Sequence, residues 1–295
     1  MRNEKTIPQF LIPNSSFLII NKPVGVTSQA IDRAVKKIFG VKHVGHAGTL
    51  DPFASGVLPI ALGRATKFIE FLTDDKSYRA EILFGRATDT ADRTGQTIAQ
   101  LESFDMPTAD RIVDVIKTFV GTIEQTPPKF SAVKLNGRKA YDLARRSIDF
   151  DIPTRLVTID RIDLVSIDDR LVTVDVDCRK GTYIRSLAVD IGKKLGLPAT
   201  LNNLRRTRSS GFSIDQSSTV EELRAESIID VERALAHMQS IEINRNRRRA
   251  FLNGLSTTVP IVDRSMIKVM CDGQFLGVGS IVERELKATK LFLTE

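Results

Sequence analysis

Residues 45 to 56, G-H-A-G-T-L-D-P-F-A-S-G, hold a single carboxylate, Asp51, in a stretch with glycine at positions 45, 48 and 56. The stretch contains too much glycine for a stable helix and too many interruptions for a central strand. Pro52 disfavours the helical conformation of the residue before it, so Asp51 lies on extended backbone. We interpret the stretch as a shaped loop built around Asp51, although an isolated Asp-Pro pair more often marks a turn or the start of a helix.

Two of the three histidines of the chain, His43 and His46, lie in or next to this loop. Their spacing allows a metal pair, but no nearby cysteine or third ligand completes a coordination sphere. The phosphate-binding pattern G-x-x-x-x-G-K-[ST] is absent, and no second carboxylate accompanies Asp51 as in glycosidases. A single aspartate that acts as nucleophile or base remains, with no metal.

The composition describes an ordinary globular protein of 295 residues, with 42% hydrophobic and 27% charged residues. No apolar run is long enough to cross a bilayer, and the first ten residues lack the apolar core of a secretion signal. Cys178 and Cys271 are far apart in the sequence and form no disulfide framework. We therefore expect a cytoplasmic protein that does not contact membranes.

Lysine and arginine number 43 against 36 acidic residues, which gives a net charge of +7 and a pI of about 9.5. Each basic cluster could simply be a solvated face, but several of them spaced along the chain favour a nucleic-acid partner. The basic clusters are K-L-N-G-R-K (134–139), R-R (145–146), L-R-R-T-R (204–208) and N-R-N-R-R-R (244–249).

Hydrophobic periodicity and capping residues predict alternating helices and strands. Helices are expected over 29–39 capped by Ser28, over 63–72, over 108–120 between Thr108 and Gly121, and from Ser186 to Gly192 or Gly196. Strands are expected at 16–21, 77–85, 156–166 and 171–178, with a polar connection at 88–96. Between about 124 and 150 the chain is proline-led and basic, which indicates an exposed excursion.

The pattern changes near 238–245, where short strands begin, with a hairpin turn at Asp272–Gly273. We therefore divide the chain into a main domain of residues 1–238 and a small β-rich domain of residues 239–295. A bare β-hairpin is the alternative for the second unit.

Several stretches together resemble the bacterial TruB family of tRNA pseudouridine synthases, over roughly residues 17–215. The longest is H-V-G-H-A-G-T-L-D-P-F-A-S-G-V-L-P-I-A-L-G-R-A-T-K at 43–67. The others, in family order, are N-K-P-V-G-V-T-S (21–28), K-S-Y-R (76–79), T-D-T-A-D-R-T-G (88–95), Q-T-P-P-K-F-S-A-V-K-L-N-G-R-K-A-Y-D-L-A-R (125–145), K-G-T-Y-I-R (180–185) and L-R-R-T-R-S-S-G-F (204–212).

The resemblance implies an α+β pseudouridine synthase fold, with a mixed, mostly antiparallel sheet flanked by helices and a small PUA-like RNA-binding domain at the C-terminus. It implies isomerisation of uridine 55 in the T loop of tRNA to pseudouridine, by a monomer without cofactor or metal. Two other functions stay open: a protein that mainly binds and refolds tRNA, and a synthase directed by a separate guide RNA.

Three residues would carry the chemistry by this resemblance. Asp51 is the catalytic aspartate, Arg185 pairs with it, and Tyr78 stacks on the uracil after it leaves the RNA helix. An arginine within a few ångströms typically lowers the pKa of a carboxyl group, so we expect a charged Asp51 in a dry pocket.

The resemblance also implies the residues that hold the RNA. His46 positions the RNA, and Tyr183 and Leu204 form walls of the uracil site. Lys22 shapes the pocket from below. Lys134 and Arg145 belong to the basic excursion, which would close over the T arm.

Overall fold

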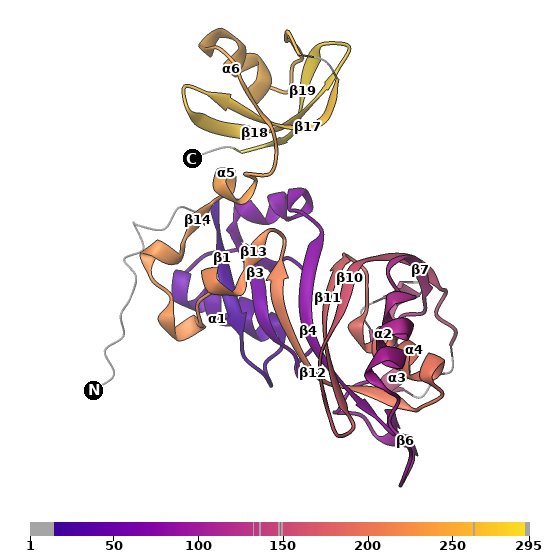
Figure 1. Ribbon diagram of the computed structural model, residues 1–295. Coiled ribbons are helices and arrows are strands. Elements are labelled where there is room, and N and C mark those ends of the chain that lie inside the picture. Colours follow the sequence, from indigo (N-terminus) through magenta and orange to yellow (C-terminus); the bar gives the residue numbers. More distant parts are fainter. Residues whose placement is uncertain are drawn as a thin grey trace, which may run out of the picture.

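The computed structural model describes residues 15–131, 133–135, 137–146, 148, 150–261 and 263–292. These residues form a body around a ten-stranded sheet and a smaller lobe around a five-stranded sheet (Figure 1).

The elements of the body are β1 (Ser15–Lys22), α1 (Ser28–Phe39), β2 (Val44–His46), β3 (Ser55–Gly63), the 3₁₀ helix η2 (Arg64–Phe71), β4 (Asp75–Phe84), β5 (Arg86–Thr88), β6 (Thr97–Gln100), α2 (Ala109–Lys117), β7 (Gly121–Gln125), β8 (Lys134–Leu135), β9 (Arg138–Lys139), α3 (Ala140–Arg145), β10 (Arg155–Asp168), β11 (Leu171–Arg179), α4 (Ile184–Leu195), β12 (Ala199–Ser209), β13 (Phe212–Ser213), three 3₁₀ turns at 214–216, 220–222 and 225–227, β14 (Ile229–Asp230) and α5 (Val231–Ala234).

The large sheet has the strand order β14-β1-β3-β12-β4-β11-β10-β7, with β2 added to β3 and β13 to β12. Neighbouring strands are antiparallel except at one joint, where β3 and β12 run parallel and pair Gly56 with Arg206. Gly56 has φ +106°, and a Cβ there would lie 2.1 Å from the carbonyl oxygen of Arg206. Only glycine permits this joint, and the Asp51 loop runs directly into it.

Helices cover the two halves of the sheet on either side of this joint (Figure 1). Helix α1 packs Ile31, Val35 and Phe39 against apolar side chains of β1 and β3. Helices α2 and α4 pack against β4, β10 and β11, and form the largest apolar cluster of the described residues. The body is therefore a mixed, mostly antiparallel sheet with helices, which confirms the predicted α+β class.

Most predicted elements are present, but several helix ends differ. The cap of α1 is Thr27, whose hydroxyl accepts a hydrogen bond from the amide of Ala30 at 3.1 Å; Ser28 was the wrong choice, because its hydroxyl serves the Asp51 loop. Thr108 caps α2 as expected, yet α2 ends at Lys117. The 63–72 segment is a 3₁₀ helix, and α4 begins at Ile184 and ends before a left-handed Gly196.

The lobe contains more than a hairpin, so the bare-hairpin alternative is wrong. Its elements are β15 (Ser240–Glu242), α6 (Arg245–Leu252), β16 (Thr257–Thr258), β17 (Arg264–Cys271), β18 (Gln274–Val282) and β19 (Glu285–Leu291). The strands are ordered β15-β17-β18-β19-β16 and curl into a half-barrel, as in a PUA-like domain. Asp272 and Gly273, both with positive φ, make the predicted turn between β17 and β18.

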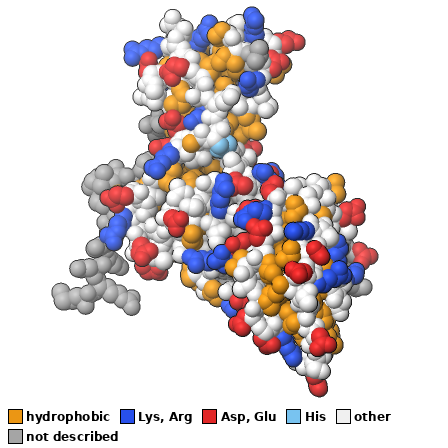
Figure 2. All heavy atoms as spheres, in the orientation of Figure 1, with side chains coloured by type: hydrophobic (Ala, Val, Ile, Leu, Met, Phe, Trp, Pro, Cys, Tyr) orange, Lys and Arg blue, Asp and Glu red, His pale blue; other side chains and the backbone are white. Residues whose placement is uncertain are grey.

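An aromatic cluster fixes the lobe to the body. Phe275 and Phe292 of the lobe lie edge-on to Phe68 of η2, each with ring centroids 5.7 Å apart. Lys290 of the lobe also pairs with Glu70 of η2 at 2.9 Å. The lobe is thus packed against the body through one buried ring, Phe68, and two half-buried rings; Figures 1 and 2 show the two parts in contact.

Basic and acidic side chains are interspersed over the face drawn in Figure 2, without one continuous basic area. Within the described part of the chain, no helix is both long and apolar enough to span a bilayer.

Candidate active site

The Asp51 loop is held in place by buried side chains that bind its backbone. The hydroxyl of Ser28 accepts from the amide of Leu50 at 2.9 Å and donates to its carbonyl at 3.1 Å. Arg206, fully buried, donates from Nη2 to the carbonyl of Gly48 at 2.8 Å and from Nε to that of Val57 at 2.7 Å. The loop is thus positioned before any ligand arrives.

Lys22 lies beneath the loop and is fully buried. Its ammonium donates to the carbonyls of Pro23 at 2.9 Å and Val26 at 2.7 Å, and more weakly to that of Pro52 at 3.5 Å. Burial lowers the pKa of Lys22 to about 8, although the charge of Asp51 works in the opposite direction. Lys22 is not among the residues that line the cavity, and its ammonium binds backbone carbonyls instead; its contact with the substrate stays a prediction.

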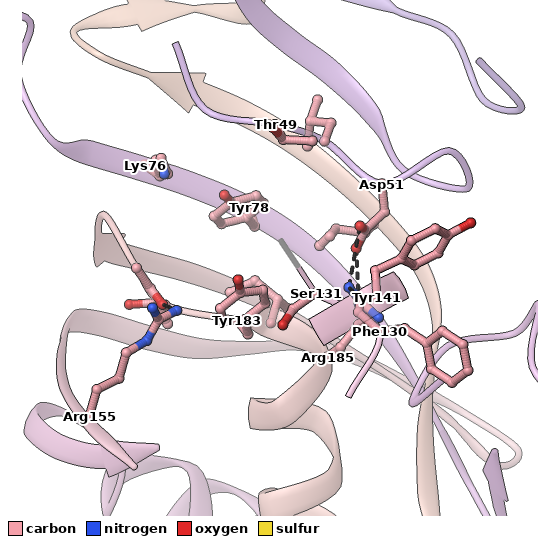
Figure 3. Close-up of a pocket in the computed structure, with 15 residues that line it drawn as sticks. Thr49, Asp51, Lys76, Tyr78, Phe130, Ser131, Tyr141, Arg155, Tyr183 and Arg185 are labelled. Atoms are coloured by element: carbon pink, nitrogen blue, oxygen red, sulfur yellow. Dashed lines mark hydrogen bonds and ion pairs between the residues drawn. The ribbon is translucent and has the colours of Figure 1, made fainter. Parts of the chain in front are cut away.

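Asp51 and Arg185 meet as predicted, although 134 positions separate them in the sequence. Nε of Arg185 lies 2.9 Å from one carboxylate oxygen of Asp51, and Nη2 donates to the other at 3.3 Å (Figure 3). Arg185 also donates to the carbonyls of Thr90 and Phe130, both at 3.0 Å. A guanidinium held by three segments gives the carboxylate one fixed orientation.

The electrostatic prediction for Asp51 needs correction. Burial raises the pKa of Asp51 above its ordinary value, and the nearby Arg185 guanidinium only partly opposes this. The attraction of the arginine alone would lower the pKa, but the loss of solvent around the carboxylate has the larger effect. The Asp51 side chain keeps 34% of its surface exposed toward the pocket.

Asp51 lies on the wall of a cavity of about 460 Å³. Tyr78, Tyr183, Leu204 and Arg185 line the same cavity, so the structure brings together five predicted residues from four separate motifs (Figure 3). The remaining lining residues are Thr49, Leu50, Lys76, Phe130, Ser131, Tyr141, Arg155, Gly181, Thr182 and Ile184.

Two tyrosines form opposite parts of the wall. Tyr78 projects from β4 and is 7% exposed; its burial raises the pKa of the phenol, and the charge of Arg206 partly offsets this. Tyr183 precedes α4, and the guanidinium of Arg155 lies 4.8 Å from its ring centre. The pocket thus combines the Asp51 carboxylate and three cationic side chains with aromatic surface, which suits a flat, polar ring.

The basic excursion is less exposed at its base than the sequence predicts. Gln125, buried, exchanges two hydrogen bonds with the backbone of Tyr183, at 3.1 and 2.8 Å. Ser186 donates to the carbonyl of Thr126 at 2.7 Å. Tyr141 of α3 packs against Phe130 and also lines the cavity.

Two other predicted RNA contacts, His46 and Arg145, are not among the described residues that line the cavity. His46 contacts Asp32 through Nδ1 at 2.7 Å and Thr49 through Nε2 at 3.0 Å. Arg145 covers the ring of Tyr141, with 4.9 Å between the guanidinium carbon and the ring centre. Lys134 lies in β8, but its side chain is outside the described part of the structure.

The sequence argument missed Asp92, Lys76 and Arg155. Asp92 is buried, accepts from Thr94 and lies 3.7 Å from Arg185, so it is a second acid on the same guanidinium. It was present in the quoted stretch T-D-T-A-D-R-T-G, which we took for a polar connection. Lys76 belongs to the quoted K-S-Y-R, whereas nothing in the sequence marks Arg155. Among the described residues no three His, Cys, Asp or Glu side chains gather as metal ligands.

Comparison with known proteins agrees with this geometry. The profile described as "TruB family pseudouridylate synthase (N terminal domain)" matches residues 36–184, and "tRNA pseudouridylate synthase B C-terminal domain" matches residues 185–241. The protein named tRNA pseudouridine synthase B of Clostridium acetobutylicum is 41% identical, over 93% of this chain and 98% of that protein. The protein of the same name in Prochlorococcus marinus is 44% identical, over 77% of this chain and 75% of that protein.

A solved structure titled "Crystal Structure of a Cbf5-Nop10-Gar1 Complex" contains a chain of the same fold. It superposes with a TM-score of 0.74 at 26% identity, over 97% of this chain and 87% of that one. Together with the two profiles and the relatives, this shows that the chain belongs to the TruB family of pseudouridylate synthases and is an isomerase.

Proposed function

We propose that the protein converts uridine 55 in the T loop of tRNA to pseudouridine. The observation that carries the proposal is the Asp51–Arg185 pair, at 2.9 Å, in the wall of a cavity of about 460 Å³. Such a volume is within the usual range of about 300–1,000 Å³ for small-ligand sites and accommodates one extruded nucleobase. The relatives' name, tRNA pseudouridine synthase B, supports tRNA as the substrate.

The reaction breaks the bond between C1′ of the ribose and N1 of uracil, and joins C1′ to C5. C5 loses a proton and N1 gains one, so the atoms of the substrate balance without a co-reactant. Asp51 acts as the nucleophile or base, and its ionised form is required in either role. Arg185 keeps the carboxylate aimed into the cavity.

A base inside the folded T loop cannot reach Asp51, so it must leave its stack at a cost of about a few kcal/mol. Tyr78 offsets this cost by stacking on the uracil, with Tyr183 and Leu204 as further walls. His46, Lys134 and Arg145 contact the RNA outside the pocket, and residues 239–295 form a PUA-like RNA-binding domain. The protein acts as a monomer without metal.

The deciding experiment incubates the purified chain with an unmodified tRNA transcript and, separately, with a bare T stem-loop, and maps pseudouridine by position. We expect modification of both RNAs at uridine 55 alone. Binding without modification would support the tRNA-folding alternative, and modification only after a guide RNA is added would support the guided one. Binding should also weaken steeply with salt, because phosphate contacts release counterions.

A further inference from the structure

The cations on the two sides of the pocket differ in whether an acidic side chain lies beside them. Arg185 has two acidic neighbours, Asp51 at 2.9 Å and Asp92 at 3.7 Å. Lys76 lines the same cavity from strand β4 (Figure 3), yet it makes no hydrogen bond or ion pair with the described part of the chain. An ammonium that is partly removed from water without a counter-ion is costly, and this cost disappears when an anion binds.

The strand register explains why no acid of the protein neutralises Lys76. Its direct neighbours across the sheet are Cys178 on β11 and Ser209 on β12. Burial raises the pKa of the Cys178 thiol to about 11, so it carries no charge at neutral pH. Of the two acids that directly precede it in the chain, Asp75 pairs with Arg208 at 3.1 Å and Asp74 with Arg179 at 3.4 Å.

A second cation lies beside the first. A Cβ on Gly48 would be 3.4 Å from Nζ of Lys76 and equally 3.4 Å from Nη1 of Arg206. That nitrogen of Arg206 is buried and makes no hydrogen bond with the described residues. Burial and the charge of Arg206 both lower the pKa of Lys76, and the more distant charge of Asp74 opposes them only in part, so an anion bound here would relieve the positive potential of the pair.

From this placement we infer that Lys76, reinforced by Arg206 behind it, binds a backbone phosphate of the RNA directly adjacent to the extruded uridine. Lys76 is then a positioning residue: it fixes the ribose and leaves the bond changes to the Asp51 side of the pocket. The phosphate is the one anionic group that an extruded nucleotide brings with it. The inference rests on the proposed function, since it takes a nucleotide of RNA as the ligand.

The test compares Lys76→Gln with Lys117→Gln, which removes the same charge from the exposed surface of α2. Dissociation constants for a bare T stem-loop are measured over a series of KCl concentrations. Lys76→Gln should weaken binding about 10-fold, as expected for a lost charged hydrogen bond. The slope of log K against log salt should become shallower by about 0.7, which corresponds to one phosphate contact. In turnover, KM should rise and kcat should stay near the wild-type value.

A neutral methylphosphonate placed on either side of the target uridine then locates the contact. At one of the two positions it should weaken binding by the wild type about 10-fold and by Lys76→Gln hardly at all, because the partner charge is already gone. Lys76→Met serves as a second neutral variant. Neither variant should melt at a lower temperature than the wild type, because each removes a partly buried charge that has no acidic partner among the residues described.

The inference would be overturned if each methylphosphonate weakened RNA binding by the wild type and by Lys76→Gln to the same extent. It would also be overturned if Lys76→Gln left the salt slope unchanged. A loss confined to kcat would overturn it as well, because it would place Lys76 on the uracil instead. These results differ from failure of the proposed function, in which the wild type itself makes no pseudouridine in the stem-loop.

Discussion

Two arginine–aspartate pairs, one in the pocket and one on the open face of strands β4 and β11, have the same kinds of side chain in different surroundings. On the pocket face, Arg185 is 5% exposed and pairs with Asp51 at 2.9 Å. On the open face, Arg79 of β4 is 55% exposed and pairs with Asp175 of β11 at a similar 2.7 Å. The distances are nearly equal and the carboxylates are similarly exposed, Asp51 at 34% and Asp175 at 28%, so the burial of the arginine distinguishes the two sites.

Burial changes what each pair can do. Around Arg79 and Asp175 water screens the charges, and such surface pairs typically contribute about 0–1 kcal/mol to stability. In the pocket, the loss of water raises the pKa of Asp51 and strengthens every charge interaction there. Reactivity is therefore expected on one face only, and the following variants test that difference.

The largest effect is expected from Arg185→Met. It removes the guanidinium that orients Asp51, and we expect the single-turnover rate to fall about 100- to 1000-fold, as for other preorganised charge contacts. Arg79→Met is the matched control, with the same loss of charge on the open face, and it should keep the wild-type rate. Circular dichroism checks that both variants fold. Equal rates for Arg185→Met and Arg79→Met would contradict the distinction.

A smaller effect is expected at Tyr78, whose neighbour Arg79 points to the open face. Tyr78→Leu removes the stacking surface, which is worth about 1–3 kcal/mol per base, so kcat/KM should fall about 10- to 100-fold. Tyr78→Phe keeps the ring and should stay closer to the wild type. If the leucine variant turned over as fast as the wild type, the stacking role would be wrong.

The raised pKa of Asp51 predicts a change in pH dependence. Activity that needs the carboxylate is lost as pH falls through its folded-state pKa, so the acid limb of kcat/KM should lie above the ordinary value of 3.8. Removing the opposing charge, as in Arg185→Met, should move the limb further up. A limb at or below 3.8 would contradict the assignment.

The loss of activity at low pH is not expected to come from unfolding caused by the protonation of Asp51. A group whose pKa is higher in the folded than in the unfolded state binds its proton more tightly when folded, so protonation of Asp51 favours the fold. Melting temperatures recorded across the same pH range provide the control.

The smallest effect is expected on the open face. A double-mutant cycle of Arg79→Ala and Asp175→Ala, measured by urea unfolding, should give a coupling energy of about 0.2–1 kcal/mol. A coupling of several kcal/mol would mean that this face is as shielded from water as the pocket.

The sequence was informative where a local rule determines the structure. Thr108, Gly196 and the Asp272–Gly273 turn act through their own backbone, while a continuous apolar run placed β1 and alternation of apolar residues placed β4. The pairing of Asp51 with Arg185 depends on the parallel joint of β3 and β12, which no local pattern encodes; it came from the resemblance of whole motifs.

What the sequence did not provide is the environment of each charge. Asp92 and Lys76 stood in quoted motifs, yet their burial, and the absence of an acid beside Lys76, follow from strand register. The same holds for Asp51, whose pKa direction is set by lost solvent. Likewise Ser28 was taken for a cap, because the Leu50 backbone that it binds is distant in the sequence.

The central claim is that the Asp51 carboxylate acts on a base held in this pocket. Asp51→Asn keeps the shape of the side chain and removes its charge, so its effect on turnover can be separated from its effect on binding. Under single-turnover conditions with saturating enzyme and unmodified tRNA, we predict binding within about threefold of the wild type and no pseudouridine at position 55, since the nucleophile or base is gone. Pseudouridine formed by the Asp51→Asn variant at a rate near that of the wild type would contradict the account.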